Sequence, residues 1–240
     1  MLSAINMSGA LDLEGLREAF PSCPVEAVDC RDIEGTACLC DDEAAAEIIR
    51  RTSGIPWRGI HWIDGGDYHY LTSLLCRKAD EPFDLLLFDH HTDMQQPRYG
   101  EIISCGGWLR DMLLHNPMLR RGVIIGAAEE LRCETEPFAE RVAMQSSPEF
   151  EGDAPVYVSI DKDVLSEEDA ATNWDQGTMR LPELIESLRL LSLRRRIIGA
   201  DICGGLREPS LKNLRADISI IGTMLDIIQV TNQNQWRKAL

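Results

Sequence analysis

The segment Asp84-Leu85-Leu86-Leu87-Phe88-Asp89-His90-His91-Thr92-Asp93 decides the fold that we expect. Its short apolar run follows Pro82 and ends in polar residues, a pattern that indicates a buried strand rather than a helix. Asp89, His91 and Asp93 occupy alternate positions, and in an extended backbone such side chains point to one face. Because open α/β sheets place ligands at the carboxyl ends of their strands, the segment predicts a metal site there.

A second segment, Val156-Tyr157-Val158-Ser159-Ile160-Asp161-Lys162-Asp163, repeats this arrangement of an apolar strand followed by carboxylates. Upstream, a predicted strand leads into Gly65-Gly66-Asp67-Tyr68-His69, where two glycines allow a sharp turn. Aspartates brought together from these strand ends would repel one another, so we expect cations to offset them. Oxygen and imidazole donors without thiolate favour two Mn²⁺ ions, and Zn²⁺, Fe²⁺ or Co²⁺ are alternatives.

The composition bounds the class of protein. With 240 residues, the chain is long enough for a large core, and we predict one domain over residues 1–240. The formal net charge of −16 argues against a nucleic-acid partner, because phosphate binding needs Lys and Arg. Neither a signal peptide nor an apolar run of about 18 residues is evident, so we expect no membrane partner. The eight scattered cysteines are typical of reduced thiols in a cytoplasmic protein.

Strand and helix patterns alternate along the chain, and the strands are apolar on both faces. This combination predicts an α/β fold with a mostly parallel sheet covered on both sides. We expect strands at residues 25–30, 59–64, 84–89, 123–126, 156–160 and 197–202. We expect helices at residues 11–16, 41–51, 71–78, 107–115, 181–193 and 218–230. Residues 134–153, rich in acids and prolines, are predicted to form a helix and a surface loop.

The three polar segments, taken in order, resemble the signature motifs of the arginase/ureohydrolase superfamily. Those motifs are Gly-Gly-Asp-His, Asp-Ala-His-x-Asp and Ser-x-Asp-x-Asp, and the resemblance spans about residues 60–205. It implies a three-layer α/β/α fold with a central, mostly parallel sheet. It also implies two metal ions, commonly Mn²⁺, and a hydroxide between them that attacks a planar carbon–nitrogen centre. Members are often oligomeric, so a homo-oligomer is an expectation, although no residue identifies an interface.

The resemblance also implies a ligand set. Asp89 and Asp161 would bridge the two metals. His69 and Asp93 would complete one metal, and His91 and Asp163 the other. Asp93 and Cys105 are the catalytic candidates, with Cys105 as a general acid in the loop where the family often has a histidine; a buried structural thiol is the alternative. His115 is a weaker substitute because it lies far along a predicted helix.

The chain departs from the family in its first motif and in its substrate-binding residues. Tyr68 stands where the family has its histidine, so we assign that role to His69 and expect Asp67 to support the site from outside. The segment Gly199-Ala200-Asp201-Ile202-Cys203-Gly204-Gly205 has Gly204 where the family has the glutamate that binds a guanidinium. Losing that partner argues against arginase activity. Our candidate substrate-binding residues are His90, Trp174, Asp175 and Glu208.

These features lead to the hypothesis of a binuclear-metal hydrolase that cleaves a linear C–N bond of a small amidine, ureido or amide compound. A histone-deacetylase-like amide hydrolase is the second hypothesis, suggested by the adjacent His90 and His91. A metal-binding protein without catalysis is the third. Two-metal phosphoester hydrolysis would need basic phosphate contacts, for which Arg98 and Arg110 are the candidates.

Overall fold

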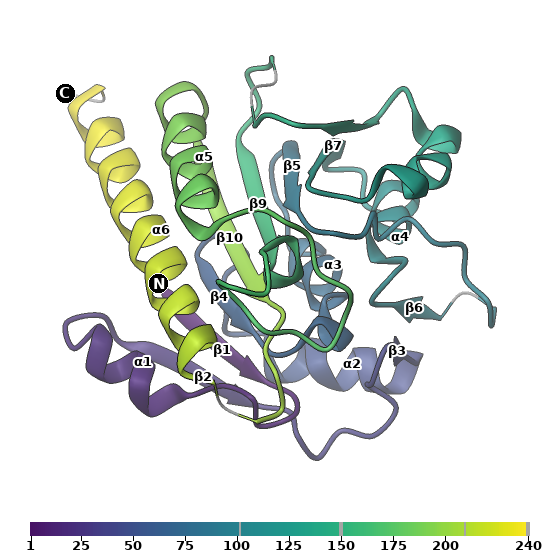
Figure 1. Ribbon diagram of the computed structural model, residues 1–240, viewed down its shortest axis with the longest axis horizontal. Coiled ribbons are helices and arrows are strands. Elements are labelled where there is room, and N and C mark those ends of the chain that lie inside the picture. The colour runs from purple at the N-terminus through teal and green to yellow at the C-terminus, as the bar shows by residue number, and fades with distance from the viewer. Residues whose placement is uncertain (101, 149–150, 209, 239–240) are drawn as a thin grey trace.

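A parallel sheet of eight strands organises the molecule, here seen in a computed structural model that describes residues 1–100, 102–148, 151–208 and 210–238. Its strands are β1 (Leu2–Asn6), β2 (Val25–Asp29), β4 (Ile60–Ile63), β5 (Phe83–Phe88), β7 (Leu119–Ile125), β8 (Val142–Gln145), β9 (Val156–Asp161) and β10 (Ile197–Cys203). They lie in the order β2-β1-β4-β10-β9-β5-β7-β8, and every neighbouring pair is parallel (Figure 1). A separate antiparallel pair joins β3 (Leu39–Cys40) to β6 (Ile103–Ser104).

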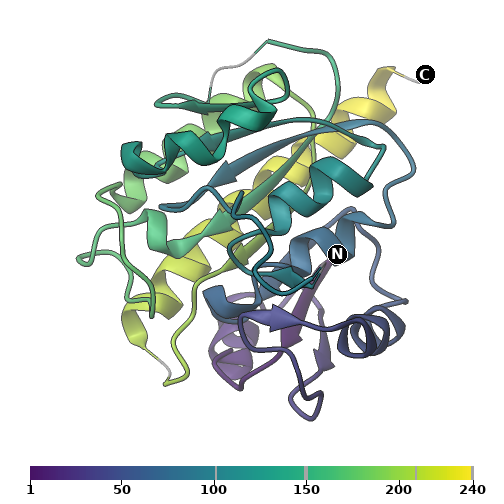
Figure 2. The ribbon, with the colours of Figure 1, turned by 90° about the vertical axis from the view of Figure 1, so that its right-hand side faces the viewer.

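Helices cover both faces of the sheet. Buried side chains of α2 (Asp42–Arg51), α3 (Leu71–Cys76) and α4 (Trp108–His115) pack on one face. Those of α1 (Leu13–Ala19), α5 (Leu181–Arg194) and α6 (Leu211–Lys238) pack on the other. Figure 2 shows the second layer, with α6 in yellow, behind the strands. Short 3₁₀ turns occur at η1 (Gly66–Tyr68), η2 (Glu129–Glu134), η3 (Glu136–Phe138) and η4 (Lys162–Val164).

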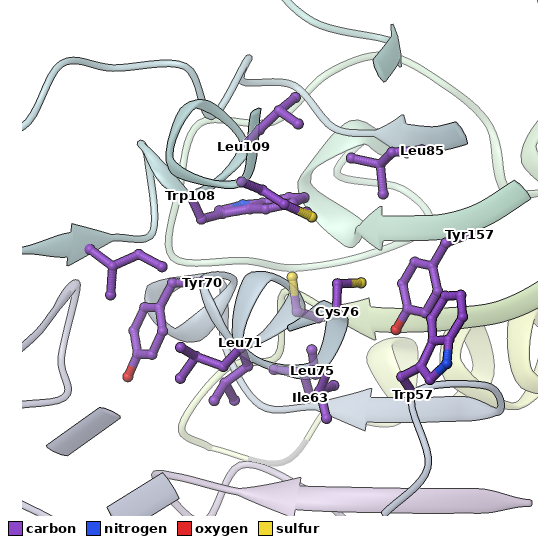
Figure 3. Packing of buried hydrophobic residues seen from close by; sticks show 14 of the residues in the cluster. Trp57, Ile63, Tyr70, Leu71, Leu75, Cys76, Leu85, Trp108, Leu109 and Tyr157 are labelled. Carbon is purple, nitrogen blue, oxygen red and sulfur yellow. The ribbon is translucent and has the colours of Figure 1, made fainter. Parts of the chain in front are cut away.

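The central strands separate two apolar cores by simple alternation. Leu85 and Leu87 of β5 face the α2–α4 layer, whereas Leu86 and Phe88 face the α5–α6 layer. Figure 3 shows the first core, where Tyr157 stacks near Trp57 at a ring-centroid distance of 6.3 Å. These four side chains of β5 are fully buried. The burial of each one stabilises the fold by about 1.5–3 kcal/mol. The central strands are thereby fixed in register.

The predicted fold class is confirmed: a mostly parallel sheet lies between two helical layers. Three local expectations need correction. Residues 134–153 contain strand β8 as well as 3₁₀ turns, although residues 149 and 150 lie outside the described ranges. Strand β1 was not expected, yet it lies between β2 and β4. The last helix begins at Leu211 rather than at residue 218. Among the described residues, no helix combines the length and apolar character needed to cross a membrane.

Candidate metal centre

The carboxyl ends of β5, β9 and β10 bring the polar segments together on the α3–α4 side of the sheet. Ser159 of β9 is in register with Leu87 of β5 on one side and with Asp201 of β10 on the other. Two residues further along, Asp161 of β9 is in register with Cys203 of β10. Residues in register on parallel strands point to the same face, and that face also carries residues two positions further along. The sheet therefore aims Asp161 and Cys203 into the space above Ser159 and Asp201.

The segment after β5 is a loop rather than the extended backbone that we expected. β5 ends at Phe88, and the His91 amide then donates to Asp89 Oδ1 at 2.6 Å, which turns the chain. Asp93 has a φ of +53°, in the left-handed region that non-glycine residues rarely adopt. Asp89, His91 and Asp93 still converge, but through a tight turn instead of strand alternation. Such strain persists where the surroundings hold it, often at functional sites.

His69 lies at the centre of the first group of donors. Its Nδ1 is 3.0 Å from Asp93 Oδ2, 3.3 Å from Asp89 Oδ2 and 3.6 Å from Asp161 Oδ2. The ring reaches this place because η1 ends there, directly before α3. A side chain at Gly66 would meet Trp174 at 2.9 Å and Asp161 at 3.0 Å, so glycine permits the close approach.

His91 belongs to a second group on the other side of Asp89. Its Nδ1 is 2.9 Å from Asp163 Oδ2 and 3.5 Å from Asp89 Oδ1. The His90 amide donates to Asp163 Oδ1 at 2.9 Å, which ties the two loops together. Asp89 thus contributes one oxygen to each group. The donor atoms of His69, Asp89 and Asp93 lie within 4.8 Å of one another, a separation that suits ligands around a metal ion. The same holds for Asp89, His91 and Asp163.

Residues outside the two groups hold the first histidine in place. His69 Nε2 is 2.9 Å from Ser159 Oγ, and that hydroxyl donates to Asp201 Oδ1 at 2.6 Å. The ring centroids of Trp108 and His69 are 4.8 Å apart, and Trp108 Nε1 donates to Asp93. Such outer partners orient a histidine and fix which nitrogen faces the ligand. The sequence analysis did not identify this support.

Close packing of buried acids changes the protonation of the donors. Burial raises the pKa of Asp89, Asp93 and Asp161 above the ordinary range, and neighbouring acids add to the effect. Burial and then Asp89 raise the pKa of Asp163 to about 6. Hydrogen bonding to Asp163, and then to Asp89, raises the pKa of His91 to about 11. These shifts mean that protons must offset charge that a metal could offset instead.

The donors open into a cavity of about 390 Å³. His69, Asp89, His91, Asp93, Asp161 and Asp163 all line it. Arg98 contributes the one guanidinium among the described lining residues and is exposed at the rim. The rest of the wall comes from Cys38, Leu39, Gly66, Gln95, Gln96, Pro97, Tyr99, Ile102, Ser104, Cys105, Gly106 and Trp174.

The candidate substrate residues fall into two sets. Trp174 lines the cavity, with its ring 5.9 Å from that of His91, and its Nε1 donates to Asp67 Oδ1 at 2.9 Å. Asp67 therefore anchors this loop over the site. His90, Asp175 and Glu208 lie outside the cavity lining: the latter two are exposed, and His90 Nδ1 is buried near Gly177.

Two positions bear on the departures from the family pattern. Cys105 lines the cavity, and burial followed by the charge of Asp93 raises the pKa of its thiol, which keeps it protonated. Gly204 has a φ of +87°, and a Cβ there would lie 2.4 Å from Asp161 Oδ1. A glutamate at this position would need a different backbone. His115, by contrast, lies on α4 beside Asp111 and is not part of the cavity.

Cys203 is a potential ligand that the sequence analysis missed. It is fully buried, and its Sγ donates to Asp161 Oδ2 at 3.1 Å. With His69 and Asp161 it forms a third group of donors within 4.8 Å of one another. The expectation of Mn²⁺ started from a donor set without thiols, whereas the structure places a thiol beside these donors. The available signal was the position of Cys203 two residues after Asp201, directly after the strand predicted at residues 197–202.

Comparison with known proteins gives one curated relative and many similar structures. No family model matches the chain. A protein of Thermotoga maritima described as uncharacterized is 34% identical over 146 residues, which cover 61% of this chain. The match spans 58% of that protein's own length.

The similar structures share an architecture. Formimidoylglutamase from Bacillus subtilis aligns with a TM-score of 0.70 at 13% identity, over 95% of this chain and 86% of that one. Proclavaminate amidino hydrolase from Streptomyces clavuligerus gives 0.68 at 19% identity, over 95% and 90%. Arginase from Bacillus cereus gives 0.67 at 15% identity, over 95% and 98%. Together with the order and placement of its own strands and helices, these alignments show that the chain has the arginase/ureohydrolase fold.

Proposed function

We propose that this protein is a binuclear-metal hydrolase that cleaves a linear C–N bond of a small amidine, ureido or amide compound. One observation carries the proposal: four buried aspartates and two histidines converge in a cavity without a buried Lys or Arg in its described lining. The names of the similar structures, which include a formimidoylglutamase and an amidino hydrolase, support this reaction class.

The donor set fits two divalent cations. His69, Asp89, Asp93 and Asp161 would hold one cation, and Asp89, His91, Asp161 and Asp163 the other. Metals in such sites lower the pKa of bound water and polarise the bond to be cleaved. Without a metal, only protons on the imidazoles and carboxyls offset this charge, and a metal would replace those protons as the partner of both kinds of donor.

The chain's own residues would position the substrate and move its proton. Trp174, fixed by Asp67, covers the donors and limits the entry of water. The Cys105 thiol keeps its proton and could deliver it to a leaving nitrogen. Because Gly204 leaves no carboxylate for a guanidinium, we favour substrates whose reacting group is a formimino, ureido or amide group. The eight free cysteines fit the cytoplasm as the compartment.

The alternatives have less support. A deacetylase-like mechanism needs two histidines facing the substrate, but His90 is not among the residues that line the cavity. Phosphoester hydrolysis needs a basic clamp, and only Arg98 of the two candidate arginines lines this cavity among the described residues.

The test is turnover by the metal-loaded protein. We would load the full chain with Mn²⁺, Zn²⁺, Fe²⁺ or Co²⁺ and assay guanidino, formimino, ureido and acylamino compounds. We expect turnover that His91→Ala abolishes and His115→Ala retains, because His115 pairs with Asp111 outside the cavity. Metal at a hundredfold excess over its dissociation constant should raise the free energy of unfolding by about 2.7 kcal/mol. Metal binding without any turnover would instead indicate a metal-binding protein that is not an enzyme.

A further inference from the structure

The donor group around His69 contains a thiol. Cys203 ends β10 in register with Asp161, so the two side chains point to the same face. The sulfur donates to Asp161 Oδ2 at 3.1 Å. The donor atoms of Cys203, Asp161 and His69 all lie within 4.8 Å of one another. The sulfur is thus within ligand reach of a metal that His69 and Asp161 would hold.

The backbone after Cys203 makes this approach possible. Gly204 adopts a φ of +87°, and a Cβ there would lie 2.4 Å from Asp161 Oδ1 and 2.8 Å from the Lys162 nitrogen. The chain can therefore turn tightly against the Asp161 loop only with glycine in this place. Gly204 thus stands where the family has its glutamate, and it also allows the end of β10 to bring the Cys203 thiol close to the donor group.

Two other thiols differ from Cys203. Cys76 is equally inaccessible and lies in the same apolar core, but it belongs to none of the candidate ligand groups in the described chain. Cys105 lines the cavity and is likewise outside those groups. Burial alone therefore does not bring a cysteine into this position.

We propose that Cys203 is a thiolate ligand of the metal held by His69 and Asp161, and that it strengthens the preference of the centre for Zn²⁺, Fe²⁺ or Co²⁺ over Mn²⁺. The inference depends on the metal centre of the proposed function. As the metal–sulfur bond forms, the thiol proton leaves to solvent, which balances the step. Soft thiolate donors select such metals, whereas oxygen donors suit Mn²⁺.

Cobalt spectroscopy of the full chain tests this ligand directly. We expect the Co²⁺ protein to show both d–d bands and a near-ultraviolet sulfur-to-cobalt charge-transfer band. Cys203→Ala should lose the charge-transfer band and keep the d–d bands, while Cys76→Ala and Cys105→Ala keep both. In competition experiments, Cys203→Ser should bind Zn²⁺ at least about 10- to 100-fold more weakly, with a smaller loss for Mn²⁺, so that the preference for Zn²⁺ narrows.

X-ray absorption by the wild-type Zn²⁺ protein needs no variant, and it should detect a sulfur neighbour at about 2.3 Å. The idea is overturned by cobalt d–d bands without a charge-transfer band, by loss of that band in Cys105→Ala alone, or by a shell of oxygen and nitrogen only. Any of these leaves the hydrolase proposal intact. Failure to bind any of the metals would instead overturn both proposals.

Discussion

The two ends of strand β5 carry buried aspartates in opposite electrostatic surroundings. Asp84, at the start, is fully buried, and its Oδ2 accepts from Arg195 at 2.7 Å and Arg121 at 3.1 Å. Asp89, directly after the end, is 1% exposed, and the charges of Asp93 and Asp161 act on it together with the imidazoles of His69 and His91.

This difference shows where the fold supplies its own counter-charge. Arg195 is itself buried, so the ion pair with Asp84 belongs to the structural core. Burial raises the pKa of Asp89, and the charge of Asp93 adds to that shift, because no arginine or lysine within the described residues pairs with it. The charge at the carboxyl edge is left for a ligand to neutralise. The start of β5 therefore carries an aspartate that is paired with arginine, and its end is followed by an aspartate for which a bound cation would supply the positive charge.

The largest effect should come from removing the ion pair between Asp84 and Arg195 at the start of β5. Asp84→Asn removes the buried carboxylate that pairs with Arg195, and we expect a loss of about 3–5 kcal/mol in the free energy of unfolding, measured by urea denaturation. Asp153→Asn is the matched control, because its 3.1 Å pair with Arg120 is exposed to solvent and should contribute far less. Equal losses in the two variants would refute the contrast.

At the metal end, the metal-free protein should lose stability as pH rises. The folded-state pKa of Asp163 is raised from 3.8 to about 6, so its contribution is full below about pH 4 and is lost as pH rises through about 6. A shift of two units corresponds to about 3 kcal/mol. Saturating metal should abolish the trend, because the carboxylate then stays ionised.

The pH measurement is best made as a difference between wild type and Asp163→Asn. Burial lowers the pKa of His61 to about 4, so His61 contributes stability that is present above about pH 6.5 and lost as pH falls through 4. The pH dependence due to His61 is opposite in sign to that due to Asp163. Because both proteins contain His61, its effect cancels when the stability of Asp163→Asn is subtracted from that of the wild type. A difference that stays flat between pH 4 and 7 would show that Asp163 does not carry the effect.

The smallest expected effect is that of Asp89→Asn, which should stabilise the metal-free protein, whereas Asp84→Asn should destabilise it. In the metal-free protein, Asp89→Asn should raise the free energy of unfolding by about 1 kcal/mol, because it removes one charge from a group of like charges. The asparagine oxygen can still accept from the His91 amide, as Asp89 Oδ1 does at 2.6 Å. The same variant should lose stabilisation by metal. Marked destabilisation of the metal-free variant would argue against repulsion at this end.

Local patterns in the sequence predicted the central strands and the convergence of their ends. Apolar runs such as residues 84–88 are long enough to indicate a buried strand, and the polar residues that follow them lie where parallel strands end. The actual path of residues 89–93 was not predicted, because it depends on a side chain–backbone hydrogen bond and on the left-handed Asp93.

Other features depend on contacts between distant parts of the chain. Asp84 and Arg195 are 111 positions apart, and nothing in a run of three arginines tells which one is buried. Cys203 meets Asp161 only because β10 and β9 pair in one particular register. Strand β1 is five residues long and gains its place from β2 and β4 on either side. A single sequence carries little local signal for such pairings.

Of the strands in the described chain, β10 comes last in sequence, yet it lies between β4 and β9 in the middle of the sheet. On a growing polypeptide, the half-sheet β2-β1-β4 and the half-sheet β9-β5-β7-β8 can each form earlier, but neither edge can be closed before β10 emerges. Until then, both halves expose unpaired strand edges that can join to other chains. Assembly of the nascent protein is therefore all-or-none at its last step, and the strand that closes the sheet also brings Cys203 to the donors.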